Sequence, residues 1–169
     1  NSAGSAQYMI DHFNLEKLLV IGTCAGIDDK YKPLDIIIPN LACQYDCTVK
    51  EIEPLIKLKF NVKLDLRELD FEFNTGTIGT ADKAVVMWKD YLELKENNIT
   101  IADTEAAGIA YICKLNNIKC LIIKGISDFP KNEDYSSKNE SNEEQLNTYF
   151  LNIPKVMTKI FTDYLEKVI

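Results

Sequence analysis

Apolar residues recur three or four positions apart in four parts of the chain. Because residues at this spacing share one face of a helix, the pattern predicts four helices. They cover residues 2–12, 85–95, 104–115 and 145–168, and the third is rich in alanine.

Short, continuously apolar runs predict buried β-strands, because a strand that is covered on both faces shows no polar alternation. These runs lie at residues 17–21, 34–39, 99–102 and 120–126. Residues 74–80 are rich in β-branched residues between glycines and are also expected to form a strand, and residues 41–49 are expected to be extended. The first run enters a glycine-rich stretch at residues 22–26, which predicts a tight turn. The closely spaced runs at 34–39 and 41–49 predict a bend or an antiparallel pair. The pattern over residues 50–73 does not decide between helix and strand.

A strand, a helix and a second strand follow one another over residues 99–126. This order predicts a βαβ unit with parallel strands. Residues 129–144 are polar and lack periodicity, which predicts a loop. Because neither a repeat nor a linker is present, we expect residues 1–169 to form one α/β domain with a mixed, largely parallel central sheet flanked by helices. Its ligand should bind at the carboxyl ends of the parallel strands.

The charge balance narrows the range of functions. The chain has 19 Lys+Arg against 26 Asp+Glu and a net charge of −7, and Arg67 is its single arginine. A basic surface for nucleic acid or for an anionic membrane is therefore not expected. His12 is the only histidine, which argues against Ser-His-Asp and Cys-His catalysis and multi-histidine zinc sites. Carboxylates, hydroxyls and backbone amides remain as the candidate chemical groups.

The five cysteines form no Cys-x-x-Cys pair, and no signal peptide or long apolar run accompanies them. This pattern is typical of reduced thiols in a cytoplasmic protein. Cys43 and Cys47 could be half of a metal site, but no second pair or nearby histidine completes it. We therefore expect neither a disulfide framework nor a bound metal.

Small and polar residues stand at the ends of three predicted strands. They are Gly-Thr-Cys-Ala-Gly at residues 22–26, Asp-Thr-Glu at residues 103–105, and Ser-Asp at residues 127–128. Taken singly, these segments are typical of a turn, a helix N-cap and the start of a loop. Taken together, they indicate a site where the strands end.

These segments, with Gly-Thr-Ile-Gly-Thr-Ala-Asp at residues 76–82, occur in the order of one family. They resemble the purine nucleoside phosphorylase and nucleosidase superfamily, and most of all its 5′-methylthioadenosine/S-adenosylhomocysteine nucleosidases. The resemblance runs from Asn1 to the C-terminal helix. It implies a nucleoside phosphorylase-like fold without the family's first strands, so we expect the sequence to be a fragment of a longer enzyme.

The resemblance also implies roles for individual residues. Asp128 matches the general acid that protonates the purine at N7, and Ser127 matches the residue that positions this acid. Glu105 matches the carboxylate that accepts hydrogen bonds from the ribose 2′ and 3′ hydroxyls. Thr23 matches the hydroxyl residue near the nucleophile. Such a site breaks the glycosidic bond through an oxocarbenium-like transition state and needs no cofactor.

Three further positions depart from the family pattern. Ala84 and Val85 match the pair that presents backbone groups to the purine edge, but Ala84 lacks the usual aromatic ring. Thr104 replaces the usual methionine beneath the ribose. Val20 stands where hexameric phosphorylases have a phosphate-binding arginine, which favours hydrolysis over phosphorolysis. The family's water-activating glutamate would lie before Asn1.

We therefore expect a nucleosidase that hydrolyses the N-glycosidic bond of a purine nucleoside such as methylthioadenosine or adenosylhomocysteine. One alternative is a phosphate-dependent purine nucleoside phosphorylase, and another is a nucleoside-binding module without turnover. The family resemblance further implies a cytoplasmic homodimer involved in methionine salvage. In that dimer Gln44, Tyr45 and Asp46 would lie at the interface.

Overall fold

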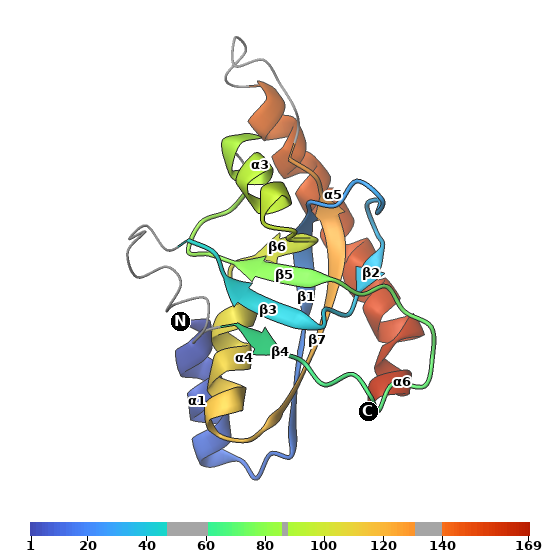
Figure 1. Cartoon of the computed structure of the whole chain (residues 1–169). Coiled ribbons are helices and arrows are strands. Elements are labelled where there is room, and N and C mark those ends of the chain that lie inside the picture. The colour runs from blue at the N-terminus through green and yellow to red at the C-terminus, as the bar shows by residue number, and fades with distance from the viewer. Residues whose placement is uncertain (47–60, 86–87, 131–139) are drawn as a thin grey trace.

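The computed structural model describes residues 1–46, 61–85, 88–130 and 140–169, and for residues 140–142 it describes the backbone alone. Within this part of the chain, seven strands form one sheet in the order β2-β7-β1-β6-β5-β3-β4 (Figure 1). The strands are β1 (Lys17–Gly26), β2 (Ile36–Ile37), β3 (Leu41–Gln44), β4 (Val62–Lys63), β5 (Thr77–Thr80), β6 (Ile101–Asp103) and β7 (Lys119–Asp128). The helices are α1 (Ser2–His12), α3 (Trp88–Glu96), α4 (Ala106–Leu115), α5 (Glu140–Asp163) and α6 (Leu165–Val168).

The sheet combines parallel and antiparallel pairs. Its longest ladder joins β1 to β7 in parallel, and β3, β5 and β6 are parallel to one another. The pairs β1–β6, β2–β7 and β3–β4 are antiparallel. A bridge from Ile37 to Asn74 links the edge strand β2 to the segment before β5, so the sheet curls on itself. The predicted fold class, a mixed and largely parallel sheet with flanking helices, is confirmed.

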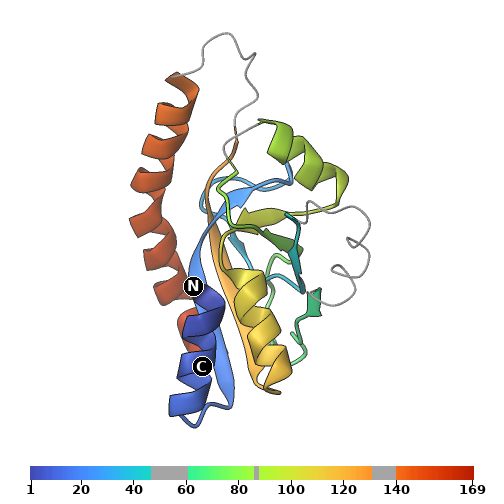
Figure 2. The same cartoon turned by 90° about the vertical axis from the view of Figure 1, so that its left-hand side faces the viewer.

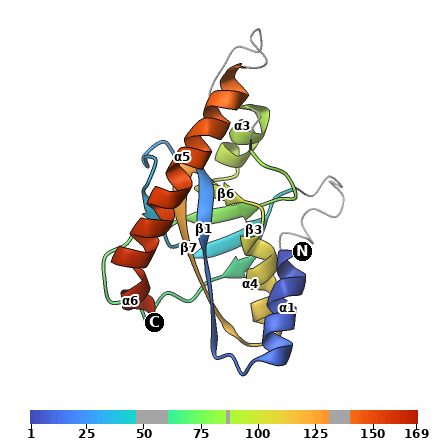
Figure 3. The ribbon, with the colours of Figure 1, turned by 180° about the vertical axis from the view of Figure 1, so that it is seen from behind.

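Helices pack against both faces of this curled sheet. Figure 2 shows α5 on one side of β1 and β7, with α4 on the other. From behind, α5 crosses these two long strands diagonally, while α1 lies beside α4 (Figure 3). Among the described residues, no helix combines the length and the apolar character that a membrane span requires.

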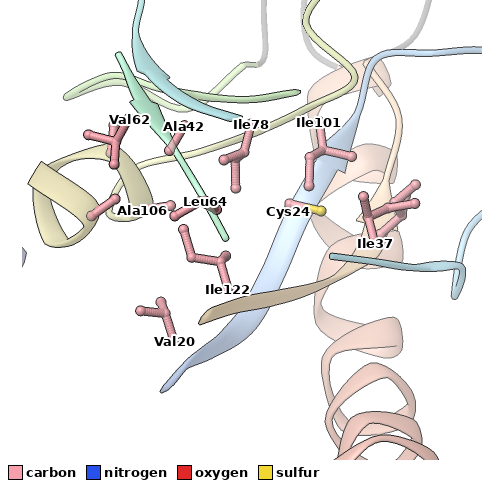
Figure 4. Packing of buried hydrophobic residues seen from close by; sticks show 13 residues of the cluster. Val20, Cys24, Ile37, Ala42, Val62, Leu64, Ile78, Ile101, Ala106 and Ile122 are labelled. Carbon is pink, nitrogen blue, oxygen red and sulfur yellow. The ribbon is translucent and has the colours of Figure 1, made fainter. Parts of the chain in front are cut away.

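Side chains that alternate along β7 fill two separate cores, because successive residues of a strand point to opposite faces of the sheet. Ile122 and Ile126 point into the core enclosed by the curl, which Figure 4 shows around Cys24 and Ile101. Leu121 and Ile123 face α5 and pack in another core with its buried Val156 and Ile160. Lys124 belongs by this alternation to the inner face, where it is the polar exception.

The predicted tight turn at residues 22–26 is wrong, because β1 continues through Gly26. Neither Gly22 nor Gly26 has the positive φ that a glycine turn requires. They serve close packing instead. A β-carbon on Gly26 would lie within 3 Å of the Phe129 ring, and one on Gly22 would lie 3.3 Å from Lys124 Nζ. The glycines therefore leave room for side chains on the inner face of the sheet.

The prediction that residues 99–126 form a unit of two parallel strands is also wrong. β1 lies between β6 and β7, and β6 is antiparallel to β1 while β7 is parallel to it. The three-residue β6 pairs with β1 only at Ala25 and Gly26, where β1 ends, and its other edge pairs with β5. α4 therefore connects β6 and β7, which lie on opposite sides of β1.

The other predicted elements shift in length. The run at 34–39 contributes only β2, which pairs antiparallel with β7 and not with β3. The last helix begins at Glu140, five residues before the predicted start, within the predicted loop. Residues 47–60, 86–87 and 131–139 lie outside the described residues, so the expectations for Cys47, for most of the loop and for the start of α3 are not tested there. Among the described cysteines, Cys24, Cys113 and Cys120 are free thiols.

Candidate functional site

A pocket of about 310 Å³ lies where β1, β6 and β7 end, beside the segment that follows β5 and the early part of α5. This volume is at the lower end of the range for small-molecule sites. The lining includes all seven residues that the sequence analysis predicts to be catalytic or substrate-binding. They are Thr23, Ala84, Val85, Thr104, Glu105, Ser127 and Asp128. The strand ends converge here because β6 runs antiparallel across the end of β1, close to the end of β7.

Asp128, the last residue of β7, is buried, and hydrogen bonds hold both of its carboxylate oxygens. Ser127 Oγ lies 2.6 Å from Asp128 Oδ1 and 3.1 Å from the carbonyl oxygen of Cys24. Because a hydroxyl has one proton, Ser127 can donate to only one of these acceptors at a time. The Ser127 hydroxyl can therefore switch its hydrogen bond between Asp128 Oδ1 and the carbonyl oxygen of Cys24.

Gln145, on α5, supplies the second donor. Its side-chain nitrogen Nε2 donates to Asp128 Oδ2 at 2.8 Å and to the carbonyl oxygen of Val85 at 3.2 Å. Gln145 is itself buried and lines the pocket. Asn152, two turns further along α5, donates to the backbone carbonyl of Ser127 at 2.6 Å. α5 is therefore fastened to the end of β7 at two points.

An ion pair lies beneath the opposite part of the pocket. Lys124 Nζ is 2.8 Å from Asp103 Oδ2 and 3.6 Å from Glu105 Oε2. The side chains of Lys124 and Asp103 are 4% and 2% exposed, whereas that of Glu105 is 47% exposed. Burial lowers the pKa of Lys124, but the charge and hydrogen bond of Asp103 outweigh this effect, so the pKa lies above its ordinary value. Lys124 is therefore positively charged, and it lies beside the carboxylate of Glu105, which is exposed to the pocket.

Asp103 has several partners besides the lysine. Its carboxylate accepts a hydrogen bond from Thr80 Oγ1 at 2.6 Å and from the backbone N–H of Ala106 at 3.1 and 3.2 Å. Thr80 Oγ1 in turn accepts from the N–H of Ala107 at 3.0 Å. These bonds join β5 and β6 to the first turn of α4. They hold the backbone that carries Glu105 to the pocket.

The remaining lining residues differ in character. Thr104 is exposed, and its hydroxyl donates to Glu105 Oε1. Ala84 is exposed and Val85 is buried. Burial raises the pKa of the Cys24 thiol, which keeps it protonated and poorly nucleophilic. No cluster of three or more metal-ligating side chains occurs in the part of the chain that the structure describes.

Sequence reasoning missed Lys124, Gln145 and the role of Asp103 toward the lysine. For Lys124 a signal was present, because a lysine inside the apolar run at residues 120–126 must find a buried partner. Asp103 was interpreted as an ordinary helix cap, and it does accept from the first turn of α4. For Gln145 the sequence offers no signal, since a polar residue near the start of an amphipathic helix usually faces solvent.

Arg67 lies away from the pocket. Its side chain is 88% exposed and pairs with Asp65. Lys83 is the lysine in the pocket lining, and its Nζ donates to Asp90 at 2.7 Å. The pocket therefore contains no guanidinium group, the group best suited to clamp a phosphate through two hydrogen bonds.

Comparisons with known proteins agree with this fold. The family model described as the phosphorylase superfamily matches residues 1–161. Aminodeoxyfutalosine nucleosidase of Campylobacter jejuni is 25% identical over 143 residues, which cover 76% of this chain and 62% of that protein. A DeoD-type purine nucleoside phosphorylase of Buchnera aphidicola is 27% identical over 142 residues, which cover 78% of this chain and 60% of that protein. The chain thus spans about 60% of the length of these curated relatives.

A solved structure shows the same fold at low sequence identity. It is S-adenosylhomocysteine nucleosidase from Streptococcus pyogenes in complex with 5-methylthiotubericidin. Its TM-score is 0.78 at 14% identity, and the match covers 99% of this chain and 75% of that chain.

Proposed function

Because the chain belongs to the phosphorylase superfamily, we propose that it acts as a nucleosidase on a purine nucleoside. The observation that carries this proposal is the pocket itself. It gathers the candidate acid Asp128 and its hydrogen-bond partner Ser127 from the end of β7, Glu105 from beyond β6, and Thr23 from β1. These are the groups that acid-assisted cleavage of an N-glycosidic bond requires.

In the proposed reaction, the bond between ribose C1′ and purine N9 breaks, and its electron pair moves onto the purine. Asp128, in its protonated form, donates its proton to N7 and so makes the base a better leaving group. Ser127 holds the carboxyl group in place through the 2.6 Å hydrogen bond to Oδ1. A water molecule then adds its oxygen to C1′ and gives up a proton to a carboxylate base.

Glu105 would accept hydrogen bonds from the two ribose hydroxyls, and its charge would favour the positive charge that develops on the sugar. Thr104 donates to Glu105 Oε1, and Lys124 lies 3.6 Å from Oε2, so the carboxylate is held from both sides. Thr23 would contact the attacking water. The carboxylate that activates this water is, in this proposal, supplied from outside the described part of the chain.

The base would be a 6-aminopurine. On adenine, the amine at C6 and the acceptor N7 lie side by side. One carboxyl group can therefore donate to N7 and accept from the amine, while the carbonyl oxygen of Val85 offers a second acceptor nearby. Methylthioadenosine and adenosylhomocysteine both carry this base, and we propose them as substrates. A place in methionine salvage follows from that choice.

Hydrolysis is supported over phosphorolysis by the electrostatics of the pocket. Val20 stands where hexameric phosphorylases have an arginine, and Arg67 is far from the lining and paired with Asp65. A phosphate ion would meet the carboxyl groups of Glu105 and Asp128 in the same lining. The similarity to a purine nucleoside phosphorylase keeps phosphorolysis as the alternative that the assay must separate.

We further propose a cytoplasmic homodimer. The free thiols of Cys24, Cys113 and Cys120 suit a reducing compartment. Gln44, Tyr45 and Asp46 remain the predicted interface segment. Measurement of the mass in solution by light scattering tests the dimer directly.

The decisive experiment measures release of free base by the whole chain, with and without phosphate. The substrates are methylthioadenosine, adenosylhomocysteine, adenosine, inosine and aminodeoxyfutalosine. We expect phosphate-independent release of adenine, reduced at least about 100-fold by Asp128→Asn, because a positioned general acid contributes roughly 10²–10⁴-fold. Asp11→Asn, which changes an exposed carboxylate on α1, is the matched control and should keep full activity.

Three outcomes would contradict the proposal. Release that requires phosphate would identify a phosphorylase. Saturable binding of adenine without release would mean that the pocket binds the base but the water-activating step is missing, which leaves a nucleoside-binding module. Neither release nor binding would remove the functional assignment altogether.

A further inference from the structure

The amide of Gln145 lies in the pocket at a point where two hydrogen-bond acceptors from other parts of the fold converge. Its single NH₂ group meets two acceptors, Asp128 Oδ2 at 2.8 Å and the carbonyl oxygen of Val85 at 3.2 Å. These acceptors come from the end of β7 and from the segment after β5. The amide donor comes from a third element, α5, and all three residues line the pocket. The amide from α5 therefore lies between the end of β7 and the segment that follows β5.

Two acceptors that converge on one point select a group with two hydrogens on one nitrogen. An exocyclic amine on an aromatic ring is such a group, because it is planar and directs its hydrogens apart in the ring plane, as a carboxamide does. The amide of Gln145 therefore has the shape and the hydrogen-bonding pattern of the amine of a 6-aminopurine. A carbonyl oxygen at the same point would face two acceptors and be repelled.

We propose that Gln145 is a specificity-determining residue that occupies the amine position of the base when the pocket is empty. A 6-aminopurine must displace the Gln145 amide to form the same two hydrogen bonds, whereas a purine without the amine leaves it in place. Gln145 thus lowers the affinity for the amino base and keeps the carboxylate of Asp128 hydrogen-bonded between turnovers. This inference rests on the proposed function, because it assumes that the base binds beside Asp128.

A purely structural role for Gln145 makes a different prediction. In that case the amide only fastens α5 to the sheet, and its loss would disturb every ligand alike. Asn152 provides the comparison, since it is also buried on α5 and donates to the Ser127 carbonyl, but it does not line the pocket. Its loss removes a fastening point and leaves the amine position as it is.

The test measures dissociation constants for adenine and for unsubstituted purine by calorimetry, with the whole chain and the variants Gln145→Leu and Gln145→Ala. These two ligands differ only in the amine. We expect both variants to bind adenine about tenfold more tightly than the wild type. Adenine then no longer has to displace the two hydrogen bonds of the Gln145 amide, and an effect of this size corresponds to the net contribution of one or two hydrogen bonds. Purine should change by less than about twofold. Asn152→Ala should move both ligands by the same factor.

Gln145→Leu keeps the bulk of the side chain, and Gln145→Ala removes it, so a packing defect in one variant is recognised by comparison with the other. Equal shifts for adenine and purine, or weaker adenine binding by both variants, would overturn this inference and leave the proposed function intact. If the wild type and the variants bind neither ligand, the proposed function fails and the role of Gln145 fails with it.

Discussion

The buried pair of Lys124 and Asp103 makes the stability of this fold depend on one lysine. Lys124→Met removes the cation and keeps an unbranched side chain of similar length. Asp103 is then a buried carboxylate whose remaining donors are Thr80 Oγ1 and the N–H of Ala106. Removal of one partner from a buried ion pair costs about 3–5 kcal/mol, because the other charge stays desolvated. The surviving hydrogen bonds place the expected loss near the lower end, at about 3 kcal/mol.

The assay is urea denaturation of the wild type and the variant, followed by the fluorescence of Trp88. If the same two proteins are unfolded by heat, a loss of about 3 kcal/mol in a chain of this length lowers the melting temperature by roughly 6–12 °C. Lys119→Met is the matched control, since Lys119 lies on the same strand and pairs with Glu68. Both side chains of that pair are more than half exposed, at 62% and 66%. Its loss should therefore cost less than about 1 kcal/mol.

A second variant separates charge from packing. Asp103→Asn in the Lys124→Met background removes the uncompensated charge, so it should restore part of the lost stability. The reasoning is refuted if Lys124→Met is no more destabilising than Lys119→Met. It is also refuted if the added Asp103→Asn lowers stability further, because the isolated carboxylate would then not be the source of the loss.

Three other results are expected. Gly125→Ala should destabilise the fold by about 1–3 kcal/mol in the same denaturation assay, because its β-carbon would lie 2.2 Å from Val156 Cγ1. Gly4→Ala on α1, where a β-carbon meets nothing within 4 Å, should stabilise it by about 0.5–1 kcal/mol, and a loss there would contradict the helical assignment. Because the pKa of Lys124 is raised above its ordinary value of 10.5, its contribution to stability is fully present below that pH and is lost as the pH rises through the raised pKa. The difference in unfolding free energy between wild type and Lys124→Met should therefore be constant from pH 7 to pH 9 and shrink above about pH 10.5.

Local pattern was sufficient for much of the molecule. The spacing of apolar residues predicted α1 and α4, the apolar runs predicted β7 and the first half of β1, and the β-branched residues at 74–80 predicted β5. These elements can be predicted because helical and strand periodicity depend on neighbours in the sequence. The polar residues at the strand ends also indicated where a site lies, although β6 reaches it by running antiparallel to β1 and not, as expected, parallel to β7.

Contacts between distant segments decided the rest. Gly22 and Gly26 look like turn residues in the sequence, yet they lie inside β1 because Lys124 and Phe129 need the space that a β-carbon would fill. β1 lies between β6 and β7, which no local pattern could show, because strand order depends on pairing across 75 or more residues.

The same distinction applies to the pocket. The sequence by itself determined most of the helices and strands, the fold class and the carboxylates at the strand ends, since each depends on residues that are close along the chain. Only the tertiary structure decided that Lys124 pairs with Asp103 and that the Gln145 amide lies between Asp128 and Val85. A buried charge or amide is stable only with its partners, and here those partners come from strands and helices far apart in the sequence.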